Sequence, residues 1–118
     1  MGRKNQVKDF VSINGSMSSA SLSGASTTVN QFDVLNYLVT WTDGQLTNGE
    51  ISIQVSLDNL KWVDLDFGSV ISINGSTGNH QLLISEVSFN FARPVFTRTN
   101  PSATGALKVE LFATNKGA

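Results

Sequence analysis

The chain has 118 residues, a formal net charge of −1 and no cysteine. That length suffices for one domain with its own apolar core, and the lack of cysteine excludes a disulfide framework, a thiolate metal site and a cysteine nucleophile. The near-zero charge provides no field that would draw the protein to nucleic acid or to an anionic membrane. Charged residues make up only 14 % of the chain, whereas Ser, Thr, Asn and Gly together supply 46 residues, a composition typical of a β domain with many turns.

The first 24 residues are expected to form an N-terminal arm. The opening stretch MGRKNQVKDF lacks the apolar region of a secretory signal peptide, which favours synthesis and folding in a cytoplasm. The composition of the Ser-rich stretch 15–27 (GSMSSASLSGAST) allows either a flexible lead-in or a short edge strand that holds Met17 and Leu22. We therefore expect a flexible arm over residues 1–24 and a β domain over residues 25–118, so that the domain should fold without the arm.

Two Asn-Gly-Ser triplets, beginning at Asn14 and at Asn74, fit two hypotheses. The triplet is the acceptor pattern for N-linked sugar, which requires entry into the secretory pathway. Asn-Gly is also the strongest short signal for a β-hairpin turn, because both residues tolerate positive φ. Since no signal peptide is recognised, we interpret both triplets as turns, with Asn74 and Gly75 in a two-residue type I′ turn.

Alternating apolar and polar residues predict β-strands through most of the remaining chain. In residues 51–57, Ile, Val and Leu alternate with Ser and Gln, and this period of two indicates a strand with one buried face. The same period occurs in residues 35–41, 63–67 and 107–111. The side chains expected to face inward are Leu35, Tyr37, Val39, Trp41, Ile51, Ile53, Val55, Leu57, Val63, Leu65, Phe67, Leu107, Val109 and Leu111.

Turn-forming residues separate these strands at short intervals. Residues 58–61 (DNLK) are expected to close a hairpin, and residues 43–49 and 100–105 to join further strands. Pro94 cannot donate to a strand ladder and so marks a bulge or a sheet edge. Short strands with regular turn signals predict an all-β fold, a single antiparallel β-sandwich of jelly-roll or immunoglobulin-like type.

Acidic residues near one tryptophan form the candidate site. Asp64 and Asp66 alternate along one strand and therefore face the same side, where Trp62 also lies. Paired carboxylates suit acid–base chemistry or Ca²⁺ binding, but the spacing of a calcium loop is missing, and His80, the single histidine, lies in an ordinary strand context. We interpret the carboxylates as charges that deter edge pairing, and we expect no catalytic residue, no metal and no cofactor.

Two aromatic residues are candidates for contacts with a partner. Trp62 is either a platform for a sugar ring or an interface anchor, or else its ring covers core atoms at the sheet edge. Phe112 faces away from the inward residues of its strand and belongs either to a second buried face or to a subunit contact. The candidate interface or ligand face thus comprises Trp62, Asp64, Asp66 and Phe112.

Several of these motifs occur together in a known group of proteins. The stretch ISIQVSLDNLKWVDLDF and the later stretch ARPVFTRTNPSATGALKVELFATNKG resemble the small β-sandwich virion structural proteins of tailed bacteriophages, over about residues 35–116. The resemblance rests on a Ser-x-Asp-x-x-x-Trp-x-Asp-Leu hairpin, an Arg-bearing strand ending in Thr-x-Thr, and a last strand opened by Gly. The matching residues are Ser56, Asp58, Trp62, Asp64, Leu65, Arg93, Thr97, Thr99 and Gly105.

The resemblance implies a non-enzymatic bacteriophage structural protein that decorates the capsid or is associated with a fibre. It implies location in the virion, assembly in the bacterial host cytoplasm, and contacts with other virion proteins. We expect a homo-oligomer, with a trimer favoured, and neither nucleic acid nor membrane as a partner. The alternative is a carbohydrate-binding or host-adhesion module, in which Trp62, or Tyr37 and Trp41, would line a concave patch.

Overall fold

All regular secondary structure in the described part of the chain consists of β-strands. The computed structural model describes residues 6–65, 71–85 and 87–115. In chain order the strands are β1 (Gln6–Ser16), β2 (Ser21–Ser23), β3 (Thr27–Thr28), β4 (Val34–Thr42), β5 (Thr47–Ser56), β6 (Val63–Asp64), β7 (Ile71–Asn74), β8 (Gly78–Ile84), β9 (Phe91–Arg98) and β10 (Ala106–Asn115).

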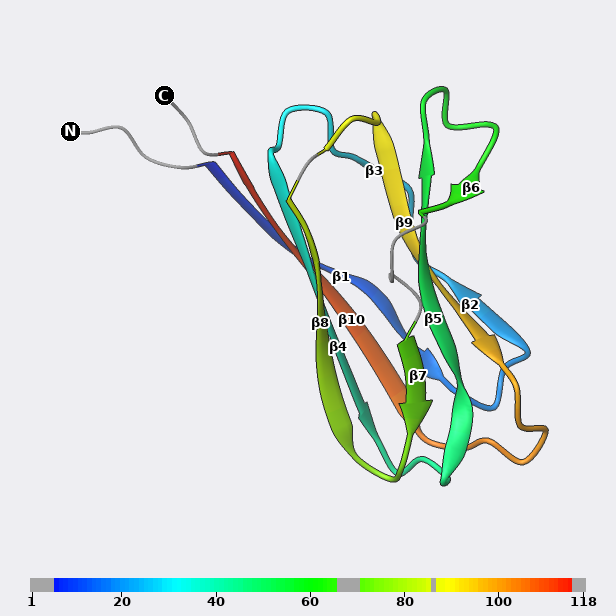
Figure 1. Ribbon diagram of the computed structural model, residues 1–118. Coiled ribbons are helices and arrows are strands. Elements are labelled where there is room, and N and C mark those ends of the chain that lie inside the picture. Colours follow the sequence, from blue (N-terminus) through cyan, green and yellow to red (C-terminus); the bar gives the residue numbers. More distant parts are fainter. Residues whose placement is uncertain (1–5, 66–70, 86, 116–118) are drawn as a thin grey trace.

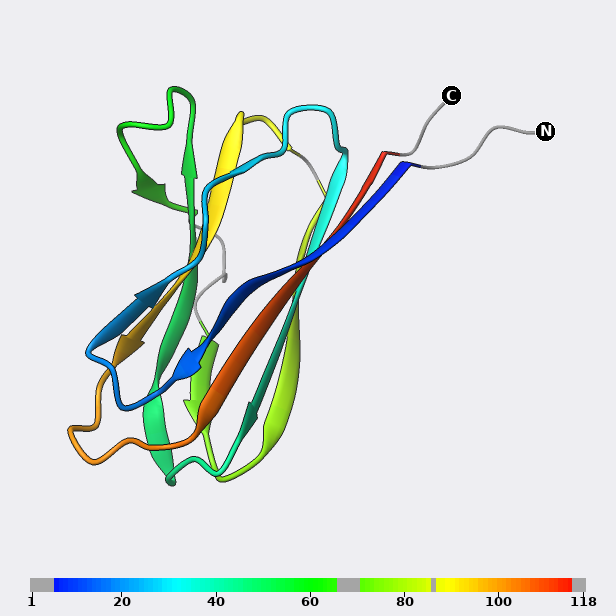
Figure 2. The same ribbon diagram turned by 180° about the vertical axis from the view of Figure 1, so that it is seen from behind.

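The strands form two antiparallel sheets that pack face to face (Figures 1 and 2). Sheet A has the strand order β1-β10-β4-β8. In sheet B, β9 and β5 are central, β2 and β3 flank β9, and β6 and β7 flank β5. The fold is therefore a β-sandwich, as the sequence predicts. Both ends of the described chain lie together at one end of sheet A (Figure 1).

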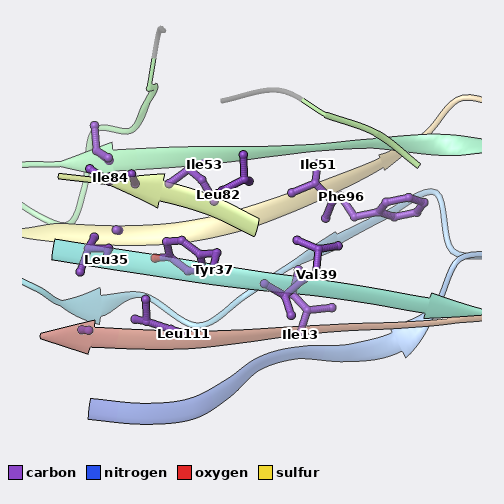
Figure 3. Packing of buried hydrophobic residues seen from close by; sticks show 14 of the residues in the cluster. Ile13, Leu35, Tyr37, Val39, Ile51, Ile53, Leu82, Ile84, Phe96 and Leu111 are labelled. Carbon is purple, nitrogen blue, oxygen red and sulfur yellow. The ribbon is translucent and has the colours of Figure 1, made fainter. Parts of the chain in front are cut away.

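The core lies between the sheets and follows the predicted alternation. The inward residues of β4, β5 and β10 are buried, and Tyr37 and Val39 of sheet A face Ile51 and Ile53 of sheet B (Figure 3). Leu57 and Val63 are exposed, contrary to the expectation, because β5 ends at Ser56 and β6 contributes only two residues to the sheet edge. The predicted inward residue Phe67 lies outside the described residues.

The N-terminal segment differs from the flexible arm expected over residues 1–24. Residues 6–16 form β1, which pairs with the full length of β10, and residues 21–23 form β2, which pairs with β9. Ile13 and Met17 are buried in the core. The bulge between Val11 and Ile13 breaks the apolar period of β1, which is why the sequence pattern conceals this strand. The strand β2, which contains Leu22, agrees with the alternative of a short edge strand in the Ser-rich stretch.

Neither Asn-Gly pair forms the expected two-residue hairpin. Asn14 and Gly15 are paired within β1, opposite Lys108 and Leu107. Gly75 does begin a turn, with φ of 86°, but Asn74 lies outside the positive-φ region and ends β7. The turn connects β7 of sheet B to β8 of sheet A, so it need not match the twist of two neighbouring strands as a type I′ turn does.

Two other predictions in sheet B agree with the structure. The turn at residues 58–61 joins β5 to β6, which pair antiparallel. Pro94 lies in β9 where the outer neighbour is interrupted between β2 and β3, and its carbonyl accepts a 2.8 Å hydrogen bond from the Gly24 N–H. The proline thus occupies a break in the sheet edge.

Asn48 joins the loops at one end of the sandwich. Its side chain is fully buried at the start of β5, and its Oδ1 accepts a 2.8 Å hydrogen bond from the Gln45 N–H. Its Nδ2 donates to the carbonyl oxygens of Gln45 at 3.0 Å and Gly75 at 3.2 Å. Its own carbonyl accepts from the Thr99 N–H at 3.1 Å. One residue therefore links the β4–β5, β7–β8 and β9–β10 connections, each of which crosses between the sheets.

Tyr37 carries a buried hydroxyl into this core. The side chain is 1 % exposed, and its hydroxyl has no hydrogen-bond partner among the residues that the structure describes. Burial disfavours the charged phenolate and raises the pKa of Tyr37 well above its ordinary value. A buried hydroxyl without a hydrogen-bond partner makes the folded chain less stable than an apolar group of the same shape would at that position.

Removing residues 1–24 should abolish cooperative unfolding. The deletion removes β1 and β2, exposes the edge of β10 and takes Ile13 and Met17 out of the core. Thermal and urea unfolding followed by circular dichroism would measure the effect. A truncated chain that melts as cooperatively as the full chain would restore the flexible-arm interpretation.

The free energy of unfolding should fall as the pH rises above about 10, the pKa of a tyrosine in the unfolded chain. The folded chain keeps the Tyr37 proton because its pKa is raised, so the unfolded state binds fewer protons in this range. Tyr37 is the single tyrosine, so tyrosinate absorbance should appear together with unfolding.

Tyr37→Phe is the matched variant for this titration. It should be as stable as the parent at neutral pH, or more stable by about 1 kcal/mol, and should lose part of the alkaline destabilisation. Tyrosinate absorbance that rises near pH 10 while the chain stays folded would contradict the burial of this hydroxyl.

Candidate functional site

Trp62 and Arg93 are stacked over the outer face of sheet B. Trp62 follows the 58–61 turn and is half-buried, and Arg93 projects from β9. The centre of the Arg93 guanidinium lies 4.1 Å from the centroid of the Trp62 ring, which is a cation–π contact. One face of the indole is therefore covered by the guanidinium.

Gln54 of β5 holds the arginine in this position. The Nε and Nη2 groups of Arg93 donate to Gln54 Oε1 at 3.0 and 2.8 Å, and Gln54 Nε2 donates to Asp64 Oδ1 at 3.3 Å. The strand register causes this arrangement, because Gln54 is directly opposite Arg93 on one side and Asp64 on the other. Directly opposite residues in antiparallel strands share a face. We call Gln54, Trp62, Asp64 and Arg93 the sheet B cluster.

The sheet B cluster contains two of the four candidate residues. Trp62 and Asp64 lie together in it, whereas Asp66 lies outside the described residues. Phe112 is half-buried on the outer face of sheet A, opposite Asn36, and so is separated from the cluster by the whole sandwich. Sequence reasoning missed Gln54 as a partner and named Arg93 only as one of the residues that carry the resemblance. The outward position of Gln54 in the β5 alternation was the available signal.

The chemistry of the sheet B cluster suits binding. It combines an aromatic face, a guanidinium, an amide and one carboxylate on an open sheet surface. His80 is exposed on β8 of the other sheet. Within residues 6–65, 71–85 and 87–115, no three His, Cys, Asp or Glu side chains gather closely enough to hold a metal ion.

Tyr37 and Trp41 are both buried in the core, although Trp41 also contributes to the wall of a second pocket, of about 230 Å³. The Trp41 indole N–H donates a 3.2 Å hydrogen bond to the Asn74 carbonyl. Of the three aromatic residues considered for a sugar site, Trp62 is the one that lies outside the core.

A shallow apolar pocket of about 430 Å³ lies beside the 58–61 turn. Its walls include Val55, Val63, Leu65 and Phe89, and Asp58 stands at its rim. Hydrogen bonds from the backbone N–H groups of Lys61 and Leu60, both 2.9 Å, lower the pKa of Asp58. The pocket suits an apolar side chain better than a sugar, because few polar groups point into it.

Comparison with known proteins identifies the fold class but gives no family. No family model matches the chain, and no curated protein matches it. A solved structure that is similar is that of the SPBc2 prophage-derived protein YomS, with a TM-score of 0.59 and 13 % sequence identity over 98 % of each chain. At this identity the likeness establishes a shared β-sandwich fold. Among the described residues, no helix is long and apolar enough to cross a membrane.

Arg93→Ala should uncover the Trp62 ring while changing stability by less than about 1 kcal/mol, the usual range for a cation–π pair at an exposed site. Acrylamide quenching of tryptophan fluorescence should increase, because Trp41 stays buried and Trp62 becomes more accessible. Arg98→Ala is the control, since Arg98 lies on the same strand and bonds the Ser18 carbonyl instead. Equal quenching in the two variants would contradict the stacked geometry.

Proposed function

We propose that the chain is a non-enzymatic structural protein of a bacteriophage particle and acts through protein–protein contacts. The observation that carries the proposal is the end-to-end likeness to a prophage-derived protein, which spans 98 % of both chains. The sequence motifs that resemble those of virion structural proteins support the proposal independently of the fold, because the resemblance depends on residues alone. Of these, Trp62, Asp64 and Arg93 lie in one cluster on the surface of the fold.

The surface chemistry supports a role in packing. Charged residues are 14 % of the chain, so neighbouring copies in a dense assembly meet few like-charge repulsions. In the described part of the chain, His80 and Asp64 lie on opposite sheets, which disfavours a shared acid–base centre. The protein would decorate the capsid or sit on a fibre, as a homo-oligomer assembled in the host cytoplasm.

Particle composition tests the proposal. Particles are purified by density gradient from the phage or induced lysogen that encodes the chain, washed at high salt and analysed by quantitative mass spectrometry. Peptides of the chain should be present at a constant, high copy number relative to the major capsid protein. A strain with the gene deleted provides the control. Absence of the chain from infectious wild-type particles would overturn the proposal.

A second candidate function, carbohydrate binding, is favoured by the sheet B cluster. A half-buried aromatic ring beside amide, guanidinium and carboxylate groups is a combination that can recognise sugar rings and hydroxyls. Isothermal titration calorimetry with bacterial surface polysaccharides tests this function, because its signal does not depend on Trp62. Binding that is lost in Trp62→Ala and kept in Arg98→Ala would support carbohydrate binding, whereas the absence of binding heat in the parent chain would contradict it.

A further inference from the structure

The outer face of sheet A carries apolar side chains at positions where a solvated sheet would have polar ones. Four of them come from four different strands and form what we call the sheet A patch, namely Val11, Leu38, Leu83 and Phe112. Leu83 is 61 % exposed and Val11 45 % exposed, and the other two are half-buried. In the described chain, the other large apolar side chains with high exposure lie at the β4–β5 loop and around the β5–β6 hairpin.

Strand register makes the sheet A patch continuous. Asn36 of β4 is directly opposite Phe112 on one side and Leu83 on the other. In the adjacent row, Glu110 is opposite Val11 on one side and Leu38 on the other. Side chains in neighbouring rows of one face are close enough for contact. The patch therefore crosses the full width of the sheet.

Asn36 lies at the centre of this surface, and its side-chain oxygen is buried. Its Oδ1 is shielded from solvent and has no hydrogen-bond donor among the described residues. A buried amide oxygen without a donor lowers the stability of the folded chain.

The charges around the patch favour a second copy of the same chain as the partner. Lys108 and Glu110 lie on this face with Nζ and Oε1 4.0 Å apart. A two-fold axis through the patch would bring a second Lys108 and Glu110 to the contact, so that opposite charges can alternate across it. A self-complementary surface of this kind is the basis of an isologous dimer.

The size of the face is sufficient for a stable dimer. Four strands about 4.8 Å apart and about ten residues long, at about 3.4 Å per residue, give roughly 600 Å² per copy. Two copies would bury roughly 1,200 Å², which reaches the range of specific interfaces. Two twisted sheets can pack face to face at about 10 Å.

We infer that sheet A packs against sheet A of a second copy in a two-fold dimer, with the sheet A patch at its centre. This inference rests on the proposed function only in that the protein acts through protein–protein contacts. It differs from the trimer expected from the sequence, because a patch with self-complementary charges closes by pairing. Dimerisation in solution is also independent of whether the chain is found in phage particles.

Solution mass is the first test. Sedimentation velocity and light scattering of the full chain at tens of micromolar should give twice the 12.7 kDa mass of one chain, with dissociation on dilution. Hydroxyl-radical labelling of Leu83 and Phe112 should fall as concentration rises, whereas labelling of Leu46, which is 83 % exposed at the end of the sandwich, should stay constant. A monomer or a trimer would overturn the inference.

Two variants locate the contact. Leu83→Lys should shift the mass to that of a monomer while the circular dichroism spectrum stays that of the folded chain, because the side chain is largely exposed in one copy. Leu60→Lys is the matched control, since Leu60 is also a leucine and is 81 % exposed but lies on the β5–β6 turn. Val11→Lys repeats the test from another strand if Leu83→Lys does not fold. A dimer that persists in a folded Leu83→Lys or Val11→Lys chain would overturn the inference, as would a dimer lost only in Leu60→Lys.

Discussion

The buried side chain of Asn48 is the interaction on which the arrangement of the two sheets depends. A sandwich is stable only when the inner faces of its two sheets stay in contact. Here three connections cross from one sheet to the other at the same end. Asn48 contacts all three, through its amide group and its carbonyl oxygen. Because the amide is buried, it cannot form hydrogen bonds with water and depends on its hydrogen bonds to the protein. Loss of the Asn48 side chain would therefore leave several polar groups unpaired.

The rigid sandwich presents two outer faces with different chemistry. The sheet B face carries polar groups held in place by Gln54, while the sheet A face carries the apolar patch around Asn36. Both surfaces arise from strand register, since each brings together residues from strands that are far apart in the sequence. A protein that must bind its own copies on one side and another surface on the opposite side needs such a division of faces.

Strands with a strict alternation could be predicted from the sequence, and those without it could not. In β4, β5 and β10 the inward residues follow a period of two, so the sandwich and most of its core could be predicted from the sequence. The bulge in β1 disrupts that period and hid this strand, whereas the Ser-rich composition around β2 allowed either a flexible arm or a short edge strand. Trp62 and Asp64 could be selected from local pattern, but their pairing with Gln54 and Arg93 depends on which strands are neighbours, and this information is absent from any single strand.

Comparing Asn48→Ala with Asn79→Ala in urea unfolding tests the central role of Asn48 most directly. Asn79 is an exposed residue of β8, so its substitution should change the free energy of unfolding by less than about 0.5 kcal/mol. Asn48→Ala should lower it by about 2–3 kcal/mol, because it leaves the Gln45 N–H and two carbonyl groups without their partner. An Asn48→Ala chain as stable as Asn79→Ala would contradict the account, since the crossing connections would then be held together by other means.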